Sequence, residues 1–173
     1  MPYHRKNTRL ASENYFGRQS YFVTVCCDCR APHLSDANHA QHVLELLLDS
    51  AVTHSFRLHA FCLVPDPIHI LAEGIHDRSD LREFIRLFKQ RTAFEFQKSH
   101  GRRLWEASYY DHILRPSDPI EDVAAYIWWN PVRKDLCTHP FEFPFSGSQT
   151  IDWMKRSLFG TAWCAPWKRK APA

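Results

Sequence analysis

The sequence lacks any long apolar run. No segment of its 173 residues approaches the roughly 18 uncharged apolar residues that a membrane-spanning helix needs. The basic start of the chain is not followed by the apolar stretch that an export signal requires. These absences predict a protein that is neither anchored in a membrane nor exported, and we expect to find it in the cytoplasm.

A large excess of one charge sign is also missing. Lys and Arg together number 22, and Asp and Glu number 19, so the net charge is only +3. A total this small does not identify a polyanion-binding protein, and only the positions of the charges can do so.

Internal repeats and low-complexity linkers are absent as well. The 45% hydrophobic and 14% aromatic content is enough for a real core, and the length fits one domain of about 100 to 200 residues. This composition excludes a disordered chain, and the length excludes a large multidomain enzyme. We expect a basic arm over residues 1–18, a folded domain over 19–137, and an aromatic and basic C-terminal extension over 138–173.

The six cysteines invite a zinc or disulfide interpretation. Three of them cluster at positions 26, 27 and 29, and the other three are scattered along the chain. A protein without an export signal meets a reducing environment, which disfavours disulfides. We therefore expect reduced thiols that pack as small hydrophobic side chains.

The apolar pattern predicts the secondary structure. β-branched and aromatic runs indicate strands, and apolar residues at helical spacing indicate helices. We expect strands over residues 21–27, 58–64, 68–73 and 109–115, and helices over 36–54, 80–100 and 119–130. The order strand, helix, strand, strand, helix, strand, helix predicts an α+β fold, with an antiparallel, ferredoxin-like or RRM-like sheet flanked by helices.

Capping residues and helix breakers set the expected helix ends. Small polar side chains accept hydrogen bonds from the first helical N–H groups, whereas Gly and Pro end helices. The expected N-caps are Ser35 or Asp36, Ser79 and Asp118, and the expected stops are Gly101 and Pro131.

The last predicted helix carries the most informative spacing. Asp122, Tyr126 and Asn130 follow one another at steps of four residues, so a tyrosine and an amide share one stripe of the helix. The stripe is either an ordinary amphipathic surface, with Asn130 as a helix stop before Pro131, or part of a site that takes partners from elsewhere in the chain.

The corner between the second and third predicted strands offers such a partner. His69 begins a strand directly after the tight turn at Pro65, Asp66 and Pro67, which fixes the direction of its side chain. A structural histidine and a metal ligand are both consistent with this position.

Taken together, several segments resemble a known family. They occur in the family's order and extend over roughly residues 9–150. The segments are Tyr21-Phe22-Val23-Thr24, Val64-Pro65-Asp66-Pro67-Ile68-His69, Leu104-Trp105-Glu106, Tyr110-Asp111-His112-Ile113-Leu114-Arg115, and Tyr126-Ile127-Trp128-Trp129-Asn130-Pro131-Val132. On these segments the chain resembles the REP-associated tyrosine transposases, a branch of the HUH single-tyrosine transposases.

This resemblance implies a protein that binds single-stranded or hairpin DNA and cuts and rejoins one strand. Tyr126 matches the family's nucleophile, which forms a 5′-phosphotyrosine and releases a free 3′-hydroxyl. The family holds Mg²⁺ or Mn²⁺ with the two histidines of its HUH motif and with an amide one helical turn beyond the tyrosine. His69 matches the second histidine and Asn130 the amide. If the chain comes from a prokaryote, the resemblance also places it at the nucleoid.

One position departs from the family pattern. Pro67 stands where the family has its first histidine, and proline offers a metal no side-chain donor. The site is then weakened or lost, unless the Asp66 carboxylate substitutes as a ligand. His59, Glu73 and His112 are further donors without motif support. The departure favours an alternative function, that of a domesticated or decayed member that binds hairpin DNA without cutting it.

Nucleic-acid binding depends on other residues. Basic side chains neutralise phosphates, and aromatic rings stack on unpaired bases. The expected DNA-binding residues are Arg82, Arg86, Lys89, Arg91, Arg102, Arg103, Arg115 and Trp129, with Trp105, Tyr109, Tyr110 and Trp128 as further aromatic candidates. For Trp128 we favour packing in the core. A metal-independent RNA-binding protein on a similar sheet remains a third hypothesis, and the oligomeric state is open.

Overall fold

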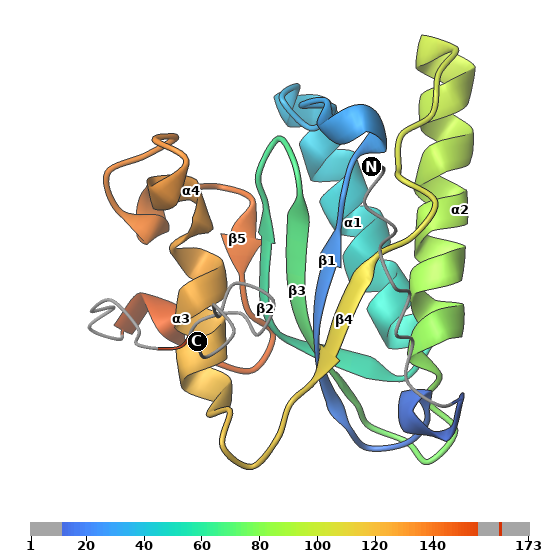
Figure 1. The fold of residues 1–173 in the computed structure, drawn as a ribbon. Helices are drawn as coiled ribbons and strands as arrows, with labels where there is room; N and C mark the ends of the chain where they lie inside the picture. The colour runs from blue at the N-terminus through green and yellow to red at the C-terminus, as the bar shows by residue number, and fades with distance from the viewer. Residues whose placement is uncertain (1–11, 156–162, 164–173) are drawn as a thin grey trace, which may run out of the picture.

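A five-stranded antiparallel sheet in the order β4-β1-β3-β2-β5 forms the centre of the protein (Figure 1). The computed structural model describes residues 12–155 and residue 163. The strands are β1 (Ser20–Val25), β2 (Phe56–Leu63), β3 (Ile68–Gly74), β4 (Tyr110–Ile113) and β5 (Ser146–Gly147). The helices are α1 (Ala37–Thr53), α2 (Leu81–His100), α3 (Ile120–Trp128) and α4 (Asn130–Arg133). Short 3₁₀ turns cover Ser12–Tyr15, Asp28–Arg30, Pro140–Glu142 and Trp153–Lys155. The predicted α+β class and its antiparallel sheet are confirmed.

Alternation along the strands gives the sheet two different faces. On β1, Tyr21, Val23 and Val25 point to the face that α1 and α2 cover, whereas Phe22 belongs to the core beneath α3. Figure 1 shows α1 and α2 together on one side of the sheet and α3 on the other. Because His69 of β3 pairs with Thr24 of β1, it lies on the α3 face. The His69 side chain therefore points to the side of the sheet that is covered by α3, the helix that contains Tyr126.

The long helices begin and end close to the predicted residues. Asp36 caps α1 by accepting a hydrogen bond from the N–H of His39. Asp80 caps α2 through the N–H groups of Arg82 and Glu83, and Gly101 ends it in the left-handed conformation with φ 66°. The predicted cap Ser79 is wrong by one residue, because its hydroxyl donates to the backbone oxygen of Ser55 instead.

Asp118 is not the side-chain cap of α3. The backbone N-cap is Pro119, and the Asp118 carboxylate accepts from the Arg115 N–H, the His112 ring and the Trp163 indole. Burial opposes the ionised form of this carboxylate, but these donors outweigh burial, and the pKa of Asp118 is lowered. The residue thus ties β4, the loop before α3 and Trp163 together.

The aromatic part after residue 138 contributes to the fold, although no periodicity marked it. Ser146 and Gly147 add β5 to the edge of β2, and the indole N–H of Trp128 donates to the Gly147 carbonyl at 3.0 Å. Trp153 stacks on Trp128 with ring centroids 5.0 Å apart. The expected basic arm and the basic end of the C-terminal extension fall largely on residues 1–11 and 156–173, of which only residue 163 is described.

The cysteines within the described residues are free, as expected. Cys26, Cys27 and Cys62 are buried and Cys29 is exposed. Cys26 and Cys29 stand at the spacing typical of zinc ligands, but the described part of the chain contains no cluster of three or more side chains able to hold a metal ion. Across the same residues, no helix is long and apolar enough to cross a membrane.

Candidate functional site on the α3 face of the sheet

Tyr126 lies on the face of α3 that packs against the sheet. Its exposed fraction is only 6%, so the interpretation of the tyrosine stripe as a solvent-exposed surface is wrong. The Phe22 ring meets the Tyr126 ring at 6.0 Å between centroids, and the Trp163 indole meets it edge-on at 4.9 Å. The Arg133 guanidinium lies over the ring, 4.4 Å from its centroid. The phenol ring is therefore held by three neighbours.

Asn130 is fixed by the break at the end of α3. In a continuous helix the carbonyl of Ile127 would accept from the backbone nitrogen of residue 131, but Pro131 has no N–H. The Asn130 amide nitrogen donates instead to the carbonyls of Ile127 and Tyr126, at 3.0 and 3.1 Å. Asn130 is thus a helix stop, as one of the two interpretations predicted. Its amide nitrogen is engaged by the two carbonyls, so its amide oxygen is the side-chain atom suited to coordinate a metal ion.

His69 reaches the same region from the sheet. Its Nδ1 lies 3.0 Å from the Thr24 hydroxyl oxygen, which fixes the orientation of the imidazole ring. The Phe22 ring contacts the His69 imidazole at 5.7 Å between centroids as well as the Tyr126 ring. This shared neighbour places the predicted nucleophile and the predicted imidazole in one layer between β1, β3 and α3.

Asp66 does not join this group. One of its oxygens accepts from the backbone N–H of Cys27 at 2.7 Å, and the other lies 2.8 Å from the Nε of Arg30. Both contacts draw the carboxylate toward the loop after β1. A substitution of the missing histidine by Asp66 would require it to leave both partners.

The donor set does not fit a divalent cation of the kind that the family pattern implies. Of the residues at the motif positions, only His69 and Asn130 carry a side-chain donor atom that is suited to the ion, because Pro67 supplies none and Asp66 is engaged by Cys27 and Arg30. Mg²⁺ and Mn²⁺ bind mainly through several oxygen ligands, so one imidazole and one amide hold them weakly.

The predicted basic residues divide into separate surfaces. Arg82, Arg86, Lys89 and Arg103 line a groove of about 490 Å³ between α2 and the segment before β4, opposite Trp105 and Tyr109. The Lys89 ammonium donates to the carbonyls of Glu106 and Ala107, which fastens that segment to α2. Arg86 forms a paired contact with Glu83, at 2.9 and 2.8 Å.

The other predicted DNA-binding residues lie outside this groove. Arg91 pairs with Asp49 of α1, and Arg102 lies over the Phe96 ring. Arg115 lines a shallow pocket near Arg18, and Trp129 is half-buried against the His139 ring. These contacts distribute the positive charge over more than one side of the molecule.

The aromatic candidates divide into core and surface. Trp105 is 4% exposed and donates its indole N–H to Thr92, so its assignment as a base-stacking platform is wrong. Trp128 is 1% exposed, which confirms the expected packing. Tyr110 is exposed on β4 and Tyr109 borders the α2 groove.

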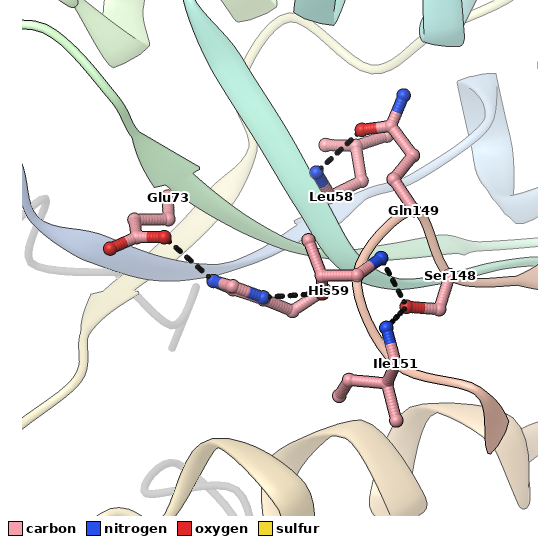
Figure 2. Close-up of polar contacts among 7 residues, drawn as sticks. Leu58, His59, Glu73, Ser148, Gln149 and Ile151 are labelled. Atoms are coloured by element: carbon pink, nitrogen blue, oxygen red, sulfur yellow. Dashed lines mark hydrogen bonds and ion pairs between the residues drawn. The ribbon is translucent and has the colours of Figure 1, made fainter.

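A second polar cluster joins the first half of β2 to the last residues of β3. His59 bridges Thr150 Oγ1 at 2.7 Å and Glu73 Oε2 at 3.0 Å. Figure 2 shows this contact beside two others, in which Gln149 accepts from the Leu58 N–H and Ser148 accepts from the Ile151 N–H. The cluster fastens the C-terminal extension to the sheet.

Sequence reasoning missed the roles of Arg133 and Trp163. Both contact Tyr126, yet no periodicity or capping signal marks either of them. The only available signal for Arg133 was its distance of seven residues from Tyr126, which places both on one side of a helix when the helix continues.

Comparison with known proteins shows the fold and the family of the chain. The fold is that of a REP-associated tyrosine transposase: a solved structure titled as such a protein bound to a REP hairpin matches with a TM-score of 0.67 and 18% identity, over 99% of this chain and 96% of that one. The family described as "Transposase IS200 like" matches residues 16–130, and the chain belongs to that family. The predicted resemblance is confirmed.

Two proteins of Haemophilus influenzae are also similar. An uncharacterized protein is 22% identical over 163 residues, which are 75% of this chain and 89% of the relative. A second, named "Putative REP-associated tyrosine transposase", is 24% identical over 106 residues, which are 54% of this chain and 59% of the relative.

Proposed function

We propose that this protein binds single-stranded or hairpin DNA and cuts and rejoins one strand through Tyr126. The observation that carries the proposal is the shared layer of Tyr126, Asn130 and His69, in which Phe22 contacts both the phenol and the imidazole ring. The family membership and the fold likeness to a protein whose solved structure is titled as bound to a REP hairpin support it.

The proposed reaction exchanges one phosphate ester for another. The Tyr126 hydroxyl oxygen attacks the phosphorus, and the bond from phosphorus to the 3′-oxygen breaks as the new bond forms. The phenol proton leaves to solvent and the 3′-oxygen takes up a proton, which yields a 5′-phosphotyrosine and a 3′-hydroxyl. Attack of a 3′-hydroxyl on the phosphotyrosine reverses the exchange and rejoins the strand.

The positive surfaces supply the proposed DNA contacts. The groove along α2 has four basic side chains and one acidic side chain, Glu106, among its lining residues. A duplex stem or a flanking strand that lies there exchanges condensed counterions for these cations, so its affinity falls steeply with salt.

A second candidate function is hairpin binding without cleavage, and Pro67 is the observation that favours it. A metal site with two remaining donors polarises a phosphate poorly, while the basic surfaces do not depend on Pro67. In this case the protein retains salt-dependent DNA binding and forms no covalent product.

Incubation with a hairpin oligonucleotide that carries single-stranded flanks separates these functions. The products are resolved on a denaturing gel, in Mn²⁺ and in EDTA, for the wild type and for Tyr126→Phe. Strand transfer predicts a protein–DNA adduct that Tyr126→Phe loses and that Tyr110→Phe, a change at an exposed tyrosine on β4, retains. Salt-sensitive binding without an adduct supports the binding-only function. Equal competition by RNA of the same sequence supports the RNA-binding hypothesis instead.

A further inference from the structure

Arg133 places a permanent positive charge beside the proposed nucleophile. Its guanidinium lies over the Tyr126 ring, 4.4 Å from the ring centroid, and one terminal nitrogen donates to the Tyr126 carbonyl. Tyr126 is buried whereas Arg133 is exposed. The charge therefore lies at the border between the phenol and the solvent from which DNA would arrive.

We propose that Arg133 binds the phosphate that Tyr126 attacks. The site has too few donor side chains to hold a divalent cation, and Arg133 supplies the positive charge in its place. The inference rests on the proposed strand transfer and on the departure at Pro67. An arginine remains charged at all physiological pH values, and its planar group of N–H donors matches two phosphate oxygens at once.

The geometry makes the guanidinium a preorganised donor. Tyr126 and Arg133 belong to the two short helices that meet at Trp129, and the Asn130 amide fixes this junction by bonding two α3 carbonyls. A guanidinium above the ring lies within reach of a phosphate carried on the ring's hydroxyl. Fixed charges aimed at developing negative charge need little rearrangement during the reaction, which is what makes them effective.

Neighbouring cations extend the positive charge away from Tyr126. Lys134 follows Arg133 in the chain, and with Arg30, Pro65, Asp66 and Leu136 it lines a cleft of about 340 Å³ at the β2–β3 corner. Lys134→Gln is therefore a matched control for Arg133→Gln, because it removes one positive charge from the neighbouring position.

The test compares adduct formation by the wild type, Arg133→Gln, Arg133→Lys and Lys134→Gln in EDTA. Glutamine keeps an amide donor for the Tyr126 carbonyl but removes the charge, and lysine keeps the charge. We expect the wild type to form the adduct without metal, Arg133→Gln to lose about 100-fold in rate, and Arg133→Lys and Lys134→Gln to stay within about tenfold of the wild type. Urea unfolding of each variant shows that the fold is intact.

Two results overturn the inference. One is a wild-type adduct that forms in Mn²⁺ and not in EDTA, and the other is an Arg133→Gln rate equal to that of Lys134→Gln. If the wild type forms no adduct in either condition, the strand-transfer proposal fails, and the phosphate contact is decided by binding alone.

The binding measurement uses the Tyr126→Phe background, in which no covalent step occurs. The slope of log affinity against log salt for a single-stranded oligonucleotide should fall by about 0.7 when Arg133→Gln removes one phosphate contact. An unchanged slope contradicts the contact. A purely structural role in ending α3 would alter stability and leave this slope unchanged.

Discussion

The Trp163 indole meets the Tyr126 ring edge-on, with an interplanar angle of 72° and centroids 4.9 Å apart. Trp163 also contacts Phe22 at 5.4 Å between centroids and donates its N–H to Asp118 at 3.1 Å. A residue far along the C-terminal extension therefore completes the packing around the proposed nucleophile.

Replacing Trp163 tests its place in this core. Trp163→Ala should lower the free energy of unfolding by about 3 kcal/mol, because it removes a large buried ring and leaves a cavity. It should also raise the rate at which tetranitromethane nitrates Tyr126, identified by peptide mass. Met154→Ala, at a side chain that is 58% exposed, should change neither. A Trp163→Ala variant with unchanged stability contradicts the packing of Trp163 against Phe22 and Tyr126.

Restoring a ligand at the corner tests the account of the metal donors. Residue 67 directly precedes β3 and stands two residues before His69, so an extended backbone there turns a histidine at 67 toward the same side as His69. Pro67→His should raise Mn²⁺ affinity by about tenfold. This is the lower end of the change in metal affinity that follows mutation of residues that support metal ligands. Calorimetric titration measures this gain, which adding His69→Gln should cancel. No gain in affinity would show that a side chain at position 67 does not face the same site as His69.

Asp66 should behave as a structural residue. Asp66→Ala leaves the buried N–H of Cys27 without its acceptor, so the free energy of unfolding should fall by about 2 kcal/mol. Arg30→Ala removes an ion pair whose arginine is 55% exposed, and its cost should stay below about 1 kcal/mol. Urea denaturation gives both values. Neither change should alter Mn²⁺ affinity, and a loss of affinity in Asp66→Ala would reinstate the carboxylate as a ligand.

Stability should fall in mild acid because of the histidines around Phe96. Burial lowers the pKa of His39, as does His100, while Asp36 opposes them and His42 and His33 add to the effect. A histidine with a lowered pKa in the folded state binds fewer protons than in the unfolded chain, so folding weakens as the pH falls below about 6.5. Replacing the histidine by an apolar ring removes this proton linkage.

The measurement is the free energy of unfolding at pH 7.5 and at pH 5.5. His39→Phe should reduce the loss between the two pH values, since the ring keeps its contacts with Phe96 and His100. The exposed His76 serves as the comparison, and His76→Gln should leave the loss unchanged. An equal loss in the wild type and His39→Phe would assign the acid sensitivity to other groups.

The sequence by itself determined the order of the elements through β1, α1, β2, β3, α2, β4 and α3. Periodicity and capping are local properties, so Asp36 and Gly101 mark helix ends without reference to the rest of the chain. The motif segments likewise identified the family, whereas the expected single helix through Tyr126 and Asn130 is wrong, because α3 ends at Trp128 and Asn130 begins α4.

Tertiary structure decided what surrounds those motif residues. The burial of Tyr126 depends on Phe22 and Trp163, which are remote in sequence, and the pairing of β5 with β2 depends on the edge of a sheet already formed. The sequence allowed Asp66 to be a metal ligand. In the folded protein, however, the loop after β1 brings Cys27 and Arg30 to its two carboxylate oxygens. Such contacts join segments whose separation no local pattern encodes, because they follow from how the layers pack and from which donors that packing brings within reach.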